Sequence, residues 1–198
     1  MRTLAEAALD ASTCIKCRLS QGRTQVVYGV GDPSADLMFV GEAPGFHEDK
    51  QGEPFVGAAG QLLNQLLSEI QIPRSDVYIN NVILCRPPGN RDPLPDELDA
   101  CKPWLDERIE IIDPAVVVTL GNWATRYILG RQVSISRVRG QRFPWNGRTV
   151  IPTFHPAAVL HGGGQASNQM TALRADFQEI RAALAERPVP AEEQLGLF

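Results

Sequence analysis

Short apolar runs that alternate with helical segments are the feature of this sequence that most constrains its fold. Each run has the length and composition of a buried strand. The runs are Leu37–Val40, Val77–Leu84, Ala115–Leu120 and Val150–Phe154. Strands that alternate with helices build a mostly parallel sheet covered by helices on both faces. We therefore predict an α/β fold of three layers, α/β/α, with a central, mostly parallel four-stranded sheet.

The segments between and after these runs predict helices and one hairpin. Apolar residues recur at helical spacing from Leu62 to Ile70. Asp96 can cap a helix that runs to about Ile112, and Asn146-Gly147 is typical of a hairpin turn. Further helices are expected over residues 121–130 and 170–186. The 198 residues fit one domain, residues 1–187, followed by a flexible tail, residues 188–198.

Polar motifs follow three of the predicted strands. Gly41–Gly45 follows the first strand, Asn80-Asn81 lies near the end of the second, and His155-Pro156 follows the fourth. Ligands of open α/β sheets bind outside the carboxyl ends of the strands. The sequence therefore predicts one site at this edge of the sheet.

Four cysteines form a possible metal site. Cys14 and Cys17 are a Cys-x-x-Cys pair, Cys85 follows a strand and Cys101 lies on a predicted helix. Four thiolates suit tetrahedral zinc or a [4Fe–4S] cluster. A redox pair and four unrelated core cysteines are the other interpretations, and spacing alone does not choose the metal.

The charge balance gives weak evidence against extensive nucleic-acid binding. The net charge is −4 and the sequence pI is about 5.4, whereas proteins that coat nucleic acid are usually basic. A local patch can still attract DNA, and four arginines surround the predicted hairpin: Arg137, Arg139, Arg142 and Arg148.

No apolar run approaches the ~20 residues that span a bilayer. The N-terminus does not look like a secretory signal, so we expect a soluble, cytoplasmic protein without membrane contact.

Several motifs together resemble one known family. Gly41–Gly45 reads GEAPG, Glu48 and Asp49 follow, and Gly52–Gly60 reads GEPFVGAAG. The later Phe154–Ala157 reads FHPA. With the four cysteines, these motifs resemble the family 4 uracil-DNA glycosylases, the iron–sulfur type, from about Cys14 to the last helix. The resemblance implies a monofunctional hydrolase of base excision repair, which releases uracil from DNA and leaves an abasic site.

The resemblance also implies a role for individual residues. Phe55 would stack on uracil, Asn81 would read its edge, and Gly41 and Ala43 would contact the base. His155 would donate a hydrogen bond to uracil O2, whereas His47 and His161 are expected to be surface residues. Glu42 is the best candidate to position the attacking water, and Glu48 would share that role. The backbone amides of Gly57, Ala58 and Ala59 are candidates for phosphate contacts.

By the same resemblance, Cys14, Cys17, Cys85 and Cys101 would hold a structural [4Fe–4S] cluster. The expected partner is uracil-containing DNA, and the protein is expected to be a monomer. The C-terminal residues Gln194–Phe198 resemble the short peptide by which bacterial repair proteins bind the sliding clamp.

Two rival functions stay open. One is a relative that captures uracil-DNA through a reactive histidine near Arg86 to Arg91, where this chain has none. The other is a non-enzymatic DNA-binding module.

Overall fold

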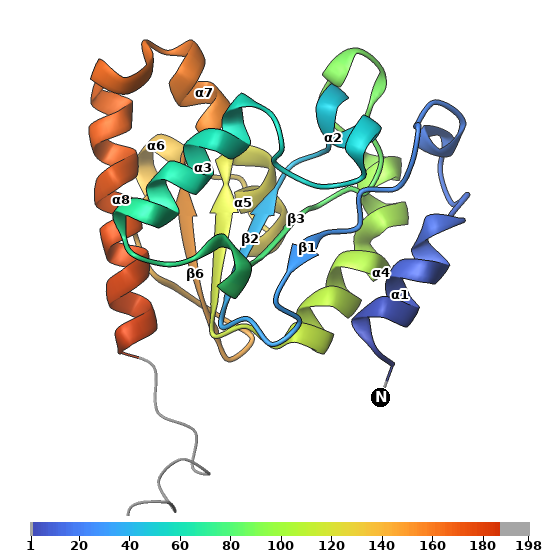
Figure 1. Cartoon of the computed structure of the whole chain (residues 1–198), viewed down its shortest axis with the longest axis horizontal. Helices are drawn as coiled ribbons and strands as arrows, with labels where there is room; N and C mark the ends of the chain where they lie inside the picture. The colour runs from blue at the N-terminus through green and yellow to red at the C-terminus, as the bar shows by residue number, and fades with distance from the viewer. Residues whose placement is uncertain (1, 187–198) are drawn as a thin grey trace, which may run out of the picture.

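A computed structural model describes residues 2–186 of the chain and places a six-stranded sheet at its centre (Figure 1). The strand order is β1-β3-β2-β4-β6-β5. The strands are β1 Val30–Gly31, β2 Leu37–Gly41, β3 Tyr78–Asn81, β4 Val116–Leu120, β5 Phe143–Trp145 and β6 Arg148–Thr153. The central four are parallel, and β1 and β5 are antiparallel edges. The four parallel strands and the hairpin are confirmed, but the sheet has six strands rather than the predicted four. The hairpin strand β5 and the two-residue strand β1, which was not predicted, each add an antiparallel edge.

Helices connect the strands and cover the sheet. The α-helices are α1 Leu4–Ser12, α2 Phe46–Gln51, α3 Ala58–Glu69, α4 Pro95–Ile112, α5 Gly121–Leu129, α6 Ile135–Val138, α7 Pro156–His161 and α8 Asn168–Ala185. Short 3-10 helices are η1 Arg18–Gln21, η2 Arg74–Asp76, η3 Pro88–Asn90 and η4 Gly164–Ala166. One predicted cap was wrong. Helix α4 begins at Pro95, so Asp96 lies inside its first turn, and the Glu97 carboxylate accepts from the Leu94 amide instead (2.9 Å).

The two faces of the sheet carry separate apolar cores. Met38 and Val40 pack with α1, α4 and α5, whereas Leu37 and Phe39 pack with α3, α7 and α8. Figure 1 shows α3 and α8 on one side of the sheet and α1 and α4 on the other. All five residues of β2 are buried because both of its faces are covered. The three-layer architecture is thus the predicted one.

A buried arginine joins α4 to the end of β3. The Arg108 side chain has no exposed surface. Its guanidinium donates to the carbonyls of Tyr28, Trp104 (3.0 Å) and Asn81 (3.1 Å). Hydrogen bonds to three carbonyls offset part of the cost of removing a cation from water. Arg108 therefore fixes the main chain of Asn81 at the carboxyl end of the sheet.

The arginines around the hairpin do not form a free basic patch. Arg139 pairs with Asp176, and Arg148 pairs with Asp113. Arg142 pairs with both Glu179 and Glu186. Three of the four predicted patch residues are therefore paired with carboxylates of the same chain.

None of the helices within residues 2–186 has the length and apolar character required to cross a membrane. The clamp-like segment Gln194–Phe198 lies outside the described residues.

Candidate active site

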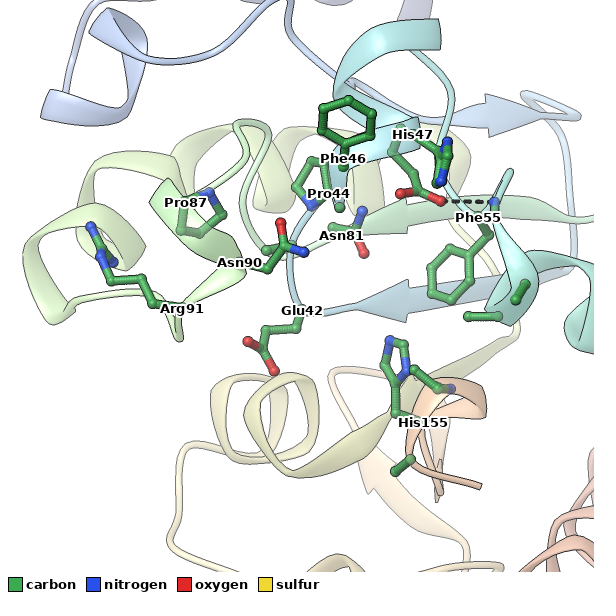
Figure 2. Close-up of a pocket in the computed structure, with 18 of the residues that line it drawn as sticks. Glu42, Pro44, Phe46, His47, Phe55, Asn81, Pro87, Asn90, Arg91 and His155 are labelled. Atoms are coloured by element: carbon green, nitrogen blue, oxygen red, sulfur yellow. Dashed lines mark hydrogen bonds between the residues drawn. The ribbon is translucent and has the colours of Figure 1, made fainter. Parts of the chain in front are cut away.

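A cavity of about 670 Å³ opens at the carboxyl ends of the parallel strands. Its lining includes six residues predicted for the site: Glu42, Ala43, Glu48, Phe55, Asn81 and His155. Figure 2 shows Glu42, Phe55, Asn81 and His155 around one space, and they come from four different segments of the chain. The loops after β2 and β3 stay paired beyond the strands. Val82 N donates to Gly41 O (2.9 Å) and Ile83 N donates to Glu42 O (3.2 Å). The sequence motifs thus meet at one edge, as predicted.

Asn81 presents an amide with an unfilled acceptor. The residue is 2% exposed, and its Oδ1 has no hydrogen-bond partner among the described residues. Buried polar atoms normally have partners, so an orphan acceptor on a cavity wall indicates a ligand that donates to it. The Arg108 bond to its backbone carbonyl holds the residue in place.

Phe55 and His155 form a stacked pair of rings. Their centroids are 5.6 Å apart and their planes differ by 27°. Phe55 adopts a left-handed backbone conformation (φ 54°), and Gly60 lies against its carbonyl. A Cβ atom on Gly60 would lie 1.7 Å from that oxygen, so only glycine permits this approach. The backbone of the GEPFVGAAG segment therefore sets the orientation of the Phe55 ring.

The imidazole of His155 is a neutral hydrogen-bond donor. Its Nδ1 accepts from the Ala157 amide (3.1 Å), which leaves the ring proton on Nε2. Burial lowers the pKa of His155 to about 4, against the opposing charge of Glu48. The ring is consequently neutral at pH 7 and offers Nε2–H as its donor.

Glu42 lies directly after β2 and has an unusual affinity for protons. Burial, and to a smaller extent the charge of Asp92, raises the pKa of Glu42 to about 7. A carboxylate with this pKa is a better base than one in water and is still partly ionised at neutral pH. Glu42 can therefore accept a proton from a bound water.

Glu48 has a different environment from Glu42. Its Oε1 accepts from the amides of Val56 (3.0 Å) and Gly57 (3.1 Å), at the start of α3. The Gly57 amide, one of the predicted phosphate contacts, is therefore already engaged by a side chain of the same chain. Asp49 is buried and accepts from the Thr24 amide (2.8 Å), which is a loop-capping role.

The four cysteines line one small pocket, which also touches Arg23. Arg23 Nη1 donates to Cys85 Sγ (3.3 Å), and burial raises the pKa of Cys101 to about 12. A thiolate at Cys101 therefore needs an adjacent positive charge, as a bound metal centre provides. Within residues 2–186, no three Cys, His, Asp or Glu side chains form a site for a single metal ion.

Comparisons with known proteins identify the family. The uracil DNA glycosylase superfamily model matches residues 28–183. The chain belongs to this superfamily. A type-4 uracil-DNA glycosylase of Sulfurisphaera tokodaii is 47% identical over 91% of this chain and 84% of its own length. One of Thermotoga maritima is 52% identical over 74% of this chain and 78% of its own.

Type-5 relatives are less similar. The type-5 uracil-DNA glycosylase of Thermus thermophilus is 32% identical over 73% of this chain and 74% of its own length. The order of these identities confirms the predicted resemblance to family 4 of the uracil-DNA glycosylase superfamily.

The cavity is also lined by several residues at its mouth for which the sequence motifs predicted no role in the site. His47 and His161 are exposed, as expected, yet both line the cavity mouth. Phe46 and Asn90 line it too, together with Arg91, which pairs with the buried Glu97 (2.6 Å). No site role was predicted for these rim residues. They lie on segments that are far apart in the chain, namely α2, the loop after β3 and the end of α7, and only the fold brings them to one cavity.

Gly41 does not line the cavity itself but lies directly behind two residues that do, Asn81 and Phe55. A Cβ atom there would lie 2.3 Å from Asn81 Oδ1 and 2.8 Å from the Phe55 ring. We expect Gly41→Ala to displace both side chains and to weaken uracil binding by about 10-fold or more, in line with a lost hydrogen bond in a closed site. Equilibrium binding of free uracil measures this effect.

The matched control for Gly41→Ala is Gly22→Ala. No atom lies within 4 Å of a Cβ at Gly22, so uracil binding should stay unchanged. Equal binding by both variants would show that Gly41 does not shape the base site.

Proposed function

We propose that this chain is a monofunctional uracil-DNA glycosylase of base excision repair, which hydrolyses the N-glycosidic bond of deoxyuridine in DNA. Uracil and an abasic site are the products. The observation that carries the proposal is the single cavity in which a ring, an unpartnered amide, a neutral imidazole and a basic carboxylate meet. Membership of the superfamily and the similarity to type-4 glycosylases support the same reaction.

The base enters the cavity after it leaves the DNA stack, because its glycosidic bond is otherwise out of reach. Phe55 then supplies a flat apolar surface for the pyrimidine ring. Asn81 Oδ1 accepts from uracil N3–H, and its amide nitrogen donates to O4. Cytosine presents an acceptor at N3 and a donor at N4, so the same amide excludes it. Ala43 lines the cavity beside the base, whereas Gly41 lies behind Asn81 and Phe55 and leaves room for both side chains.

Cleavage of the bond places negative charge on the leaving uracil. The electron pair of the N1–C1′ bond stays with N1 and spreads to O2. His155 Nε2–H stabilises that charge by donating to O2, and it does so as a neutral group that loses no proton. Donors that are already positioned for a developing charge are among the largest contributions to catalysis.

Water completes the reaction at the sugar carbon. Glu42 accepts a proton from the attacking water, whose oxygen forms the new bond to C1′. Glu48 is engaged by two backbone amides, and we assign it a positioning role for the Phe55 segment and the water. Ala58 and Ala59, at the start of α3, line the cavity where a phosphate of the substrate would pass.

The cysteine pocket fits a [4Fe–4S] cluster held by Cys14, Cys17, Cys85 and Cys101. All four cysteines line that pocket, and cysteine thiolates are the ligands that hold such clusters in proteins. When bound, the cluster supplies a cross-link between the N-terminal segment, the loop after β3 and α4. No step of the hydrolysis passes through it.

The test of this function is uracil release from a labelled oligonucleotide between pH 5 and 9. We expect release to rise with pH and to level off above about pH 7, because Glu42 acts as a base and must be ionised. Below pH 6 the rate should fall about tenfold per unit. Glu42→Gln should lose most activity and the pH dependence around pH 7.

Glu53→Gln is the control for Glu42→Gln, since Glu53 is exposed and lies outside the cavity lining.

The folded-state pKa of Glu42 lies above its ordinary value, so Glu42 destabilises the fold as pH rises toward 7. Glu42→Gln should therefore melt at a higher temperature than wild type at pH 8, by roughly 2–4 °C per kcal/mol. An absence of uracil release at every pH would refute the proposed function.

A further inference from the structure

Phe46 is an exposed aromatic residue at the mouth of the base cavity. It is the first residue of α2, lines the cavity and is 49% exposed. The other exposed large apolar residues among residues 2–186 are aliphatic: Leu9, Ile15, Leu94 and Leu160. Figure 2 shows Phe46 at the outer edge of the site, on the same side as Pro44 and Asn81. An exposed ring beside a binding site indicates a surface that becomes covered when the ligand binds.

Two cations accompany this ring. The Arg86 guanidinium carbon lies 5.1 Å from the ring centroid, and Lys50 Nζ lies 6.0 Å from it. Arg86 is oriented by its Nε, which donates to Asn90 Oδ1 (2.7 Å). The Arg86 side chain thereby contacts both Asn90 of η3 and Phe46 of α2, two residues that line the cavity. We call Phe46, Lys50 and Arg86 the rim platform.

We propose that the rim platform binds the nucleobase next to the flipped uracil in the same DNA strand. Phe46 stacks on that base, and Arg86 and Lys50 approach the flanking phosphates. Aromatic rings with neighbouring cations are the usual recognition elements for unpaired nucleic acid. This inference deepens the proposed function and rests on it.

Three observations support this occupant. Phe46 lines the same cavity as the residues proposed to bind uracil, so the ring lies beside the entrance that a flipped base would use. Lys50 and Arg86 of the rim platform are positively charged, although the net charge of the chain is −4. These two side chains can attract phosphate locally. Around the hairpin, by contrast, three arginines are already paired with carboxylates.

The platform also predicts a preference for single-stranded DNA. In a single strand, the base beside the uracil is unpaired and can turn onto Phe46. In a duplex, the same base remains paired and stacked, and moving it costs free energy. Loss of the ring should therefore weaken binding to a single strand more than binding to a duplex.

The test uses an oligonucleotide with one 2′-fluoro-deoxyuridine, in which the fluorine slows bond cleavage, and 2-aminopurine on its 5′ or 3′ side. We expect wild-type protein to quench 2-aminopurine at one of the two positions. Phe46→Leu keeps an apolar side chain without a ring, and it should abolish the quenching and raise Kd for the single strand by about 10-fold. Phe46→Trp should retain both properties.

Leu9→Ala is the matched control, because Leu9 is exposed (72%) on α1, outside the cavity lining. Melting temperatures of all variants separate a folding defect from a lost contact. Quenching at neither position by wild type, or equal Kd values for Phe46→Leu and Phe46→Trp, would overturn the platform alone if uracil release is intact. Failure of wild type to release uracil would overturn the proposed function together with the platform.

Discussion

Replacing His155 by alanine is expected to lower kcat for uracil release by about 10²- to 10³-fold. The Nε2–H donor acts on charge that develops only as the glycosidic bond breaks. Its removal should therefore reduce kcat far more than the affinity for the uncleaved DNA. Single-turnover kinetics on a uracil oligonucleotide, together with Kd for the 2′-fluoro analogue, measures the two effects separately.

The chain provides two further histidines for comparison. His47 and His161 line the cavity mouth but are exposed, so alanine at either position should cause a much smaller loss than at His155. His155→Gln, which keeps a side-chain donor, should recover part of the rate. The assigned role would be wrong if His155→Ala retained wild-type kcat, or if all three alanine variants lost activity equally.

Replacing Cys101 by serine is expected to eliminate the proposed iron–sulfur cluster and to destabilise the fold. Cys101 is 4% exposed and belongs to the pocket that all four cysteines line. In the proposed cluster, Cys101 would link α4 to the loop after β3 and to the N-terminal segment, and serine would remove that link. We expect loss of the absorbance near ~400 nm that iron–sulfur proteins show. Iron content should fall with it, and the melting temperature should drop by on the order of 10 °C.

Ala100→Ser is the control for Cys101→Ser. Ala100 also lines the cysteine pocket, but the change leaves the four thiols in place. Absorbance and iron content should then match the wild type. Stoichiometric zinc in the wild-type protein, or full iron content in Cys101→Ser, would contradict the assigned cluster.

The central sheet was predictable from sequence because its strands are buried on both faces. Such strands are continuous apolar runs, as in β2 and β4, and they contrast with the polar motifs that follow them. Strand β1 has two residues and no periodic pattern to detect. Helix α4 starts one residue earlier than its predicted cap because Glu97, rather than Asp96, binds the free amide before it.

The candidate site was predictable to the extent that its residues lie in motifs at strand ends. Glu42, Phe55, Asn81 and His155 do so, and they share one cavity. Other features depend on packing between distant segments. Arg108 reaches Asn81 across 27 positions of the chain, and the ring of Phe46 meets Arg86 from another loop. Local sequence patterns cannot predict such contacts, nor the carboxylate partners that neutralise the hairpin arginines.

The short connection from Asn81 to Cys85 has a consequence for how this protein would fail. Both residues are buried, and the chain between them is paired with the segment after β2. A displacement of the Cys85 thiol is therefore expected to move the Asn81 side chain as well. Arg108 holds the backbone carbonyl of Asn81 at the same point. If Cys85 holds the proposed cluster, we expect its oxidation to weaken the selection of uracil over cytosine by Asn81 before the domain unfolds.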